Sequence, residues 1–253
     1  MSDMLTMVRA LCLWLPEAVE QLSHGSPNFK VRGKSFASFV VNHHGDGRVA
    51  LWLHAKPAQQ AALVDADPEH LFVPPYVGSR GWIGARLDRG LSWRRAAELV
   101  RDAYAGVAPP HLVALIGDLP EVQGASRPPA PEELDPFETP RGQKILAMIR
   151  AICGEFPEVR ETRQFGCPVW QAGKKTFAWA RHDSGKLTLC FWVGVDAQGL
   201  MCADERFYVP AYLGARGWIA LDVTRRADRR EIAALALASY RHFALERMRR
   251  LLP

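Results

Sequence analysis

Hydrophobic and polar residues follow each other along the first half of the chain in a pattern that predicts helices and β-hairpins. Leu5, Val8 and Leu11 recur at helical spacing. Two β-rich runs then flank an Asp46-Gly47 step, which is a strong signal for a hairpin turn. The predicted elements are, in order, a helix over 4–14, strands over 29–31, 35–41 and 48–54, a helix over 57–66, strands over 71–73 and 82–87, and a helix over 93–105.

The second half of the chain repeats this pattern. Residues 68–83 match residues 204–219 at nine of sixteen positions, at an offset of 136. The identical positions include Trp, Tyr, Pro, Arg and Gly, so chance does not account for them. Further matches are 25–37 with 166–178, Trp52 with Trp192, and Tyr104 with Tyr240. We therefore predict an α+β fold with two tandem copies of an antiparallel sheet, each with helices packed on one side.

Details of the second copy follow from the same comparison. Its hairpin is expected to turn at 183–186, and its closing helix to cover 229–240. The counterpart of the 57–66 helix, residues 196–202, is shorter and contains Gly199. We expect this segment to be partly irregular, because glycine weakens a helix interior.

A proline-rich, acidic segment separates the two copies. Proline interrupts helices and favours extended, semi-rigid chain. The predicted organisation is a first domain over 1–117, a linker over 118–140 and a second domain over 141–253.

The repeated motifs resemble those of the MmcQ/YjbR family. They comprise Gly-x-Pro-x-aromatic at 25–29 and 166–170, Lys-Ser/Thr-Phe-Ala at 34–37 and 175–178, and Tyr-x-Gly-x-Arg-Gly-Trp-Ile at 76–83 and 212–219. The resemblance covers most of the chain, once per copy. It implies a frataxin-like, "double-wing" fold and the family's usual label of DNA-binding protein. A label of this kind comes from the fold, whereas function belongs to sites.

Composition places the chain among globular proteins. Hydrophobic residues make up 48% of it, and no apolar run is long enough to span a bilayer. The start has no basic segment of the secretory type, so we expect a cytoplasmic protein. The five cysteines form no CxxC pair and are expected to be buried or incidental thiols.

Positive charge is concentrated in the second half. Residues 1–125 hold 12 Lys+Arg against 12 Asp+Glu, whereas residues 126–253 hold 20 against 15. This asymmetry is typical of a nucleic-acid or acidic-membrane surface, and equally of the solvated face of a terminal helix.

No catalytic motif is present, so we expect a protein that is not an enzyme, with no cofactor and no metal. His-Glu-x-x-His, Gly-x-Ser-x-Gly and phosphate-binding loop patterns are absent from the sequence. His43 and His44 are adjacent, and neighbouring residues on a strand point to opposite faces. We therefore do not expect the two imidazoles to bind one metal ion. The sequence leaves open a single catalytic site that is built from residues far apart in the chain.

Aromatic and basic residues recur in both copies and are the candidate site. Tryptophans in such patterns are usually sheet core. The candidate nucleic-acid contacts are Lys34, Arg80, Lys174, Lys175, Arg216, Arg225, Arg226, Arg229 and Arg230. The candidate ligand-stacking residues are Trp52, Tyr76, Trp82, Trp192, Tyr212 and Trp218. The segment 78–81 is either phosphate-binding backbone or a simple tight turn.

Three functions are compatible with these residues. The first is DNA binding, supported by the basic second half and opposed by the neutral first half. The second is binding of a planar aromatic small molecule in a cleft between the copies, for sequestration or self-resistance. The third is a structural or protein-partner role for an exposed sheet face.

Overall fold

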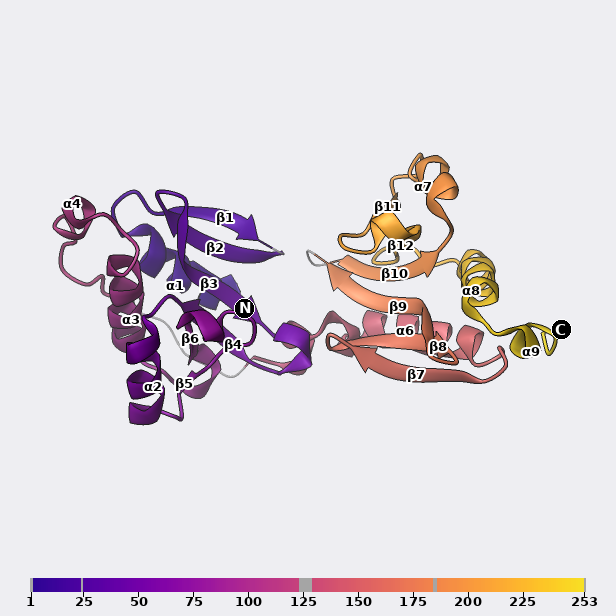
Figure 1. Ribbon diagram of the computed structural model, residues 1–253, viewed down its shortest axis with the longest axis horizontal. Coiled ribbons are helices and arrows are strands. Elements are labelled where there is room, and N and C mark those ends of the chain that lie inside the picture. Colours follow the sequence, from indigo (N-terminus) through magenta and orange to yellow (C-terminus); the bar gives the residue numbers. More distant parts are fainter. Residues whose placement is uncertain (1, 24, 123–128, 184–185, 253) are drawn as a thin grey trace. The chain divides into compact units, whose positions relative to one another are not determined.

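The computed structural model describes residues 2–23, 25–122, 129–183 and 186–252. Figure 1 shows the chain from indigo to yellow. It forms two compact units: unit 1 is Met1–His43 with Gly47–Leu134, and unit 2 is His44–Asp46 with Asp135–Pro253. The division between Leu134 and Asp135 falls inside the proline-rich linker. Linker residues 123–128, and Ser184 and Gly185 of the predicted second hairpin turn, lie outside the described residues.

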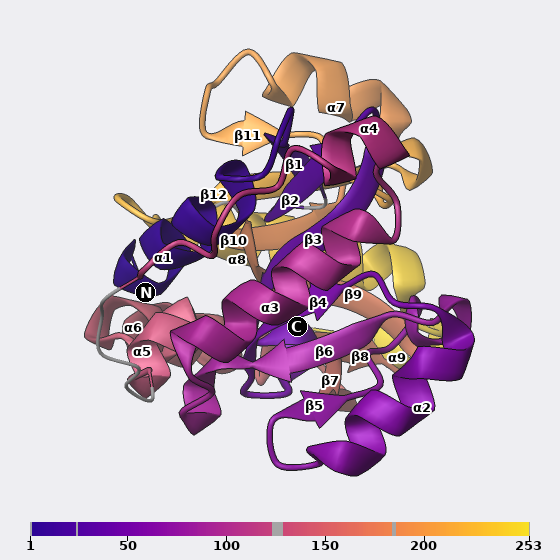
Figure 2. The same cartoon turned by 90° about the vertical axis from the view of Figure 1, so that its left-hand side faces the viewer.

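Unit 1 is a six-stranded antiparallel sheet with helices on one face. Figure 2 shows α1 and α3 crossing in front of its strands. The strand order is β1-β2-β3-β4-β6-β5. The main elements are α1 (Ser2–Leu13), β1 (Val19–Ser23), β2 (Ser26–Val31), β3 (Lys34–Val41), β4 (Val49–Leu53), α2 (Pro57–Ala66), β5 (Leu71–Phe72), β6 (Ile83–Arg86), α3 (Trp93–Ala105), α4 (Pro110–Val113) and α5 (Pro131–Leu134).

Unit 2 repeats this topology. Its sheet runs β7-β8-β9-β10-β12-β11, which is the strand order of unit 1 shifted by six strands. The elements are α6 (Pro140–Cys153), β7 (Val159–Gln164), β8 (Cys167–Ala172), β9 (Lys175–Asp183), β10 (Lys186–Trp192), α7 (Val195–Met201), β11 (Phe207–Tyr208), β12 (Trp218–Asp222), α8 (Arg229–Phe243) and α9 (Glu246–Arg249). The predicted α+β class with two tandem copies is confirmed.

Two local expectations were wrong. The edge strands β1 and β7 were not predicted, because Val19–Ser23 and Val159–Gln164 are largely exposed and carry no clear apolar alternation. The segment expected to be partly irregular is a continuous helix, α7. Its Gly199 is exposed, and Gln198 on its inner side is hydrogen-bonded to unit 2.

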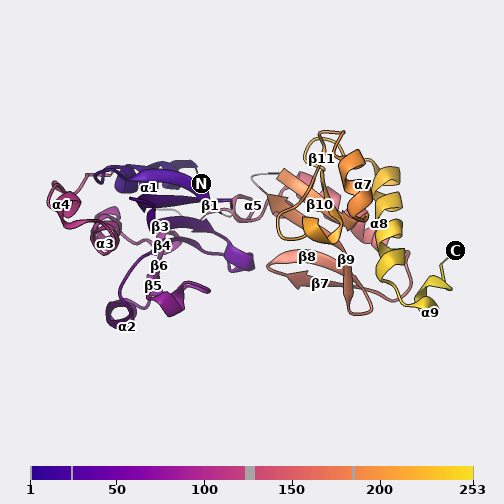
Figure 3. The same cartoon turned by 45° about the horizontal axis from the view of Figure 1, so that its top comes forward.

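The core of each unit lies between the sheet and its helices. In Figure 3, α8 runs alongside the sheet of unit 2. The long helices α3 and α8 each carry a fully buried tyrosine, whose hydroxyl donates to the carbonyl of a proline that follows the first helix of the same unit. These bonds are Tyr104 Oη to Pro16 O, 2.6 Å, and Tyr240 Oη to Pro157 O, 2.7 Å. Each bond fastens the closing helix to the start of the sheet.

The other side of each sheet, here called the open face, carries one row of side chains across the strands. In unit 1 the paired residues are Asn28, Ser38, Trp52, Gly84 and Phe72. In unit 2 they are Val169, Trp179, Cys190, Ala220 and Tyr208. Trp52 therefore corresponds to Cys190, and the sequence alignment of Trp52 with Trp192 is wrong by two residues.

No helix among the described residues is long and apolar enough to cross a membrane.

Candidate functional site

The most similar parts of the two units are the connections between their last two strands. These connections, here called the Tyr–Arg turns, are residues 73–82 in unit 1 and 209–218 in unit 2. Each contains a short 3-10 helix, Gly78–Arg80 or Gly214–Arg216. Gly78 N donates to Pro74 O at 3.0 Å, and Gly214 N donates to Pro210 O at 3.0 Å. The same backbone is therefore built twice.

Each turn closes at a glycine that no other residue replaces easily. Gly81 has φ 90° and Gly217 has φ 83°, in the left-handed region that glycine enters without steric cost. A Cβ at Gly81 would also lie 2.6 Å from Ala55 O, and one at Gly217 would lie 2.9 Å from Gly194 Cα. Sterics thus fix the path of both turns.

A glutamine from the preceding helix holds each turn from below. Figures 2 and 3 both show α2 beside the β5–β6 edge of unit 1. Gln60 Nε2 donates to Gly78 O at 2.8 Å and to Trp82 O at 2.6 Å. In unit 2, Gln198 Nε2 donates to Gly214 O at 2.8 Å and to Trp218 O at 2.7 Å. One amide group thus joins both ends of the 3-10 segment.

Sequence reasoning missed these two glutamines. They lie 138 residues apart, between the offsets of 136 and 141 that mark the repeat. That spacing was a usable signal, because a polar residue recurring at equivalent places in two otherwise apolar helix faces indicates a shared buried hydrogen bond.

The tyrosine of each turn is exposed in an unusual backbone conformation. Tyr76 has φ 62° and Tyr212 has φ 66°. Left-handed backbone is uncommon for a bulky side chain and costs about 1–3 kcal/mol. The exposed fractions are 67% for Tyr76 and 77% for Tyr212. Both units therefore keep an uncommon backbone conformation at a largely exposed tyrosine. The ring of Tyr76 meets that of His43 edge to face, with centroids 5.8 Å apart.

Lysines and an arginine gather at the end of each sheet that carries the turn, here called the turn end. The register places the start of β3 and the end of β4 beside the start of β6. The equivalent ends of β9, β10 and β12 meet in unit 2. The exposed basic residues at these ends are Lys34, Lys56 and Arg80 in unit 1, and Lys174, Lys175 and Arg216 in unit 2.

These six side chains are available for an anion. Among the residues that the structure describes, none of the six forms an ion pair with an acidic side chain. The basic hairpin residue Arg32, by contrast, pairs with Glu17 at 2.5 Å. Unit 1, neutral in total, therefore has a positive turn end.

The four arginines around the start of α8 lie elsewhere. β12 ends at Asp222, which pairs with Thr188 at the end of the sheet opposite the turn end. Arg225 and Arg226 follow this strand, and α8 begins with Arg229 and Arg230. Arg229 pairs with Glu155 at 3.3 Å, and Arg226 with Asp228 at 4.0 Å. The nine candidate nucleic-acid residues thus do not form one cluster: unit 2 separates this group from Lys174, Lys175 and Arg216.

Most of the candidate tryptophans belong to the open-face clusters. Trp52 is 9% exposed and Trp218 is 6% exposed. Trp82 is half-buried against the unit 1 cluster. Trp192 is half-buried and stacked on His242, with ring centroids 3.4 Å apart. Of the six candidate ligand-stacking residues, only Tyr76 and Tyr212 are largely exposed.

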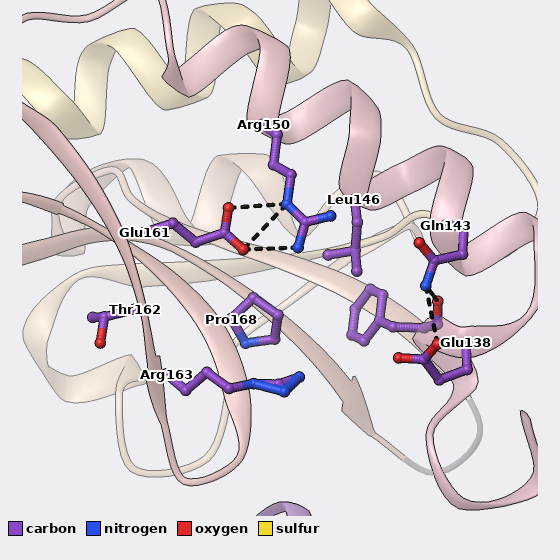
Figure 4. A pocket seen from close by; sticks show the side chains of 9 residues that line it. Glu138, Gln143, Leu146, Arg150, Glu161, Thr162, Arg163 and Pro168 are labelled. Carbon is purple, nitrogen blue, oxygen red and sulfur yellow. Dashed lines mark hydrogen bonds and ion pairs between the residues drawn. The ribbon is translucent and has the colours of Figure 1, made fainter. Parts of the chain in front are cut away.

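One shallow depression of about 470 Å³ lies between α6 and β7 of unit 2. Figure 4 shows that several of its polar side chains have partners within the protein. Arg150 binds Glu161 at 2.8 Å, and Gln143 donates to Phe137 O at 2.9 Å and to Glu138 at 3.3 Å. Arg163, which also lines the depression, lies 4.0 Å from Asp135. Most of the charged groups here therefore already have partners within the protein.

Within the described ranges, no group of three or more His, Cys, Asp or Glu residues is arranged to hold a metal ion. Cys12 and Cys153 are fully buried, and burial raises the pKa of both thiols. Neither thiol has the lowered pKa of a reactive cysteine.

Comparisons with known proteins agree with the internal repeat. No curated protein matches the chain. The chain is similar to the Deinococcus radiodurans protein DR2400, a DUF419 domain with a crystal structure, with 24% sequence identity and a TM-score of 0.34. The match covers 40% of this chain and 75% of that chain. The family model described as YjbR matches residues 13–105 and again residues 154–242. The chain therefore belongs to the YjbR family, with one YjbR domain in each copy.

Proposed function

We propose that this protein binds DNA without chemistry, through the turn end of each unit. The observation that carries the proposal is the repeated Tyr–Arg turn, which has an exposed arginine beside exposed lysines at the same end of the sheet. Neutralisation of phosphates by Lys and Arg supplies most of non-specific DNA affinity. The formal net charge of +5 and the pI near 9.1 support an anionic partner.

The spacing within one turn end suits a phosphate backbone. Lys34 begins β3, and Arg80 lies three residues before the start of β6. Neighbouring strands lie about 4.8 Å apart, so β3 and β6, two strand spacings apart, are separated by about 10 Å. Phosphates along one DNA strand follow each other at about 3.4 Å of helix rise, so Lys34 and Arg80 would reach different phosphates. Two such ends in one chain would add avidity if both engage one DNA molecule.

The test is a titration of a labelled duplex of about 25 bp by fluorescence anisotropy at rising salt. We expect a steep loss of affinity with salt. The double variant Arg80→Glu/Arg216→Glu should weaken binding and lower the magnitude of the log–log salt slope by about 2. Its matched control is Arg225→Glu/Arg226→Glu, which makes the same change of charge at the other end of unit 2. The salt slope of this control should be steeper than that of Arg80→Glu/Arg216→Glu.

Three results would count against the proposal. Equal loss in both double variants would mean that net charge matters rather than the turn end. Loss in the control alone would move the DNA surface to the start of α8. Absence of binding even at low salt would remove DNA as the partner.

A planar aromatic small molecule is the second candidate, and one observation favours it. Exposed apolar side chains surround the turn of unit 2, namely Val195 and Leu200 of α7, Val209 and Tyr212. Such a surface can stack a flat ring, with Arg216 as partner for an acidic group. A rise in melting temperature with planar acidic aromatics, lost in Tyr212→Ala, would support this ligand. An unchanged melting temperature across such a panel would exclude it.

A further inference from the structure

The exposed tyrosines indicate more than attraction to phosphate. A left-handed conformation at Tyr76 and Tyr212 is a standing cost to folding, and asparagine or glycine would adopt it more easily. Burial recovers little of this cost, because 67% and 77% of these residues stay exposed. The ring of Tyr76 meets that of His43 edge to face, with centroids 5.8 Å apart. Glu17 and Glu158 share this backbone region in both copies, so the backbone alone does not decide the matter. A bulky ring held in it and left largely exposed points to a function outside the fold.

The fixed backbone next to each tyrosine also supports a function for the ring outside the fold. The segment after each tyrosine is fixed by a closing glycine and by the glutamine that bonds both of its ends. A rigid aromatic side chain loses little conformational entropy when a planar partner stacks on it.

Each ring also has a cation at a fixed distance along the chain. Arg80 follows Tyr76 by four residues, and Arg216 follows Tyr212 by four. Both arginines are exposed. Proteins bind unpaired nucleotides by combining an aromatic ring, on which the nucleobase stacks, with a nearby basic side chain that contacts phosphate.

We infer that the two Tyr–Arg turns bind single-stranded nucleic acid, with an unpaired base stacked on Tyr76 and another on Tyr212. This inference rests on the proposed function and narrows it. In a duplex the faces of the bases are stacked on each other, so a protein ring cannot use them without unpairing. A stacked tyrosine reads neither the sugar nor the base sequence. The site therefore takes DNA and RNA strands alike.

The experiment compares three labelled probes by anisotropy with the full chain: a DNA strand of about 25 nucleotides, an RNA strand of the same sequence, and the DNA duplex. The variant is Tyr76→Asn/Tyr212→Asn, since asparagine tolerates the left-handed backbone and removes the ring. We expect single-strand affinity to fall about 5- to 100-fold per tyrosine, and duplex affinity to change little.

The matched control is Tyr76→Phe/Tyr212→Phe, which keeps the rings and should keep single-strand affinity. A melting curve of each variant shows that it is folded. Unchanged single-strand affinity in the asparagine variant, or preference for the duplex in the wild type, would overturn the inference while the proposed DNA function stands. A preference for RNA over the matching DNA strand would overturn sugar-independent stacking. Absence of binding to all three probes at low salt would overturn both.

Discussion

The open faces of the two sheets differ far more than the turns beside them. Unit 1 has a tryptophan on β4, Trp52, next to Ser38 on β3. Unit 2 has Trp179 on β9, in the place of Ser38, next to Cys190 in the place of Trp52. In unit 1, Asn28 donates to Ser38 Oγ at 2.5 Å, whereas its counterpart in unit 2 is the apolar Val169.

This difference teaches what each surface must supply. A large side chain is needed to cover the middle of the open face, and a tryptophan on either of two neighbouring strands satisfies that need. The Tyr–Arg turn has not changed in this way: its tyrosine, arginine, two glycines and supporting glutamine are the same in both units. The glycines and the glutamine are explained by the backbone that they hold, so only the exposed tyrosine and arginine point to a requirement beyond packing.

The largest expected effect comes from exchanging the tryptophan position in unit 2. Trp179→Ser alone should destabilise that unit by about 3–5 kcal/mol, because it removes a buried indole. Cys190→Trp alone should cost about 1–3 kcal/mol by overpacking. The double variant copies the arrangement of unit 1, so we expect it to be at least ~1 kcal/mol more stable than the sum of the single effects predicts. Urea unfolding of the four proteins checks this.

If the effects of Trp179→Ser and Cys190→Trp on the free energy of unfolding were additive, the idea that a tryptophan on either strand can cover the open face would be contradicted. The two open faces would then be independently packed surfaces, and the position of the tryptophan would have no bearing on its neighbour.

Removal of the glutamine that supports a turn should come next. Gln198→Ala removes a side-chain donor from two carbonyls: Gly214 O keeps its bond from Gly217 N, whereas Trp218 O loses its bond from the amide, and an unsatisfied buried group costs about 1–3 kcal/mol. We expect a loss of about 1–3 kcal/mol in unit 2. The effect of Gln60→Ala should be smaller, because that side chain is only half-buried. Urea unfolding of each variant measures it.

The control for this prediction is Gln59→Ala, an exposed residue on the same helix as Gln60. Equal stability of Gln60→Ala and Gln59→Ala would show that the hydrogen bonds to Gly78 and Trp82 contribute nothing net.

The sequence predicted the fold better than the site, for a physical reason. Hairpins, helices and the duplication are recorded in local patterns and repeated residues, such as the Gly-Trp-Ile of both turns. Register is not local: gaps in the repeat hid the fact that Trp52 corresponds to Cys190 until the strand pairing was known. The arginines around 225–230 are close in sequence to the rest of unit 2, yet the strand direction carries them to the opposite end of the sheet.

The asparagine variant of the turns should have a smaller effect on stability, and in the opposite direction. Tyr76→Asn/Tyr212→Asn relieves two left-handed tyrosines, so we expect unfolding free energy to stay equal or rise by up to ~1 kcal/mol per site. Thermal unfolding monitored by circular dichroism measures the change. A clear drop in melting temperature would mean that the rings stabilise the fold, which would remove the stability argument for their function.

The smallest expected effect concerns two histidines at equivalent ends of the sheets. His54 in unit 1 lies beside Trp82, whereas Trp192 at the equivalent strand position in unit 2 is stacked on His242. Burial lowers the pKa of His54, and Lys56 lowers it further; burial lowers the pKa of His242. Each folded unit thus disfavours the imidazolium form.

The sign of the pH dependence follows from these shifts. A histidine whose folded pKa lies below its ordinary value of 6.5 contributes fully to stability above pH 6.5. As the pH falls from about 6.5 through the lowered pKa, the unfolded chain binds the proton first and stability is lost. We expect His242→Gln to reduce this loss in unit 2 and His54→Gln to reduce it in unit 1, as measured by urea unfolding at about pH 5.5 and about pH 7.5. Identical pH dependence in wild type and both variants would show that neither imidazole is coupled to folding, and that the exchange of His54 for a stacked Trp192–His242 pair is a packing difference alone.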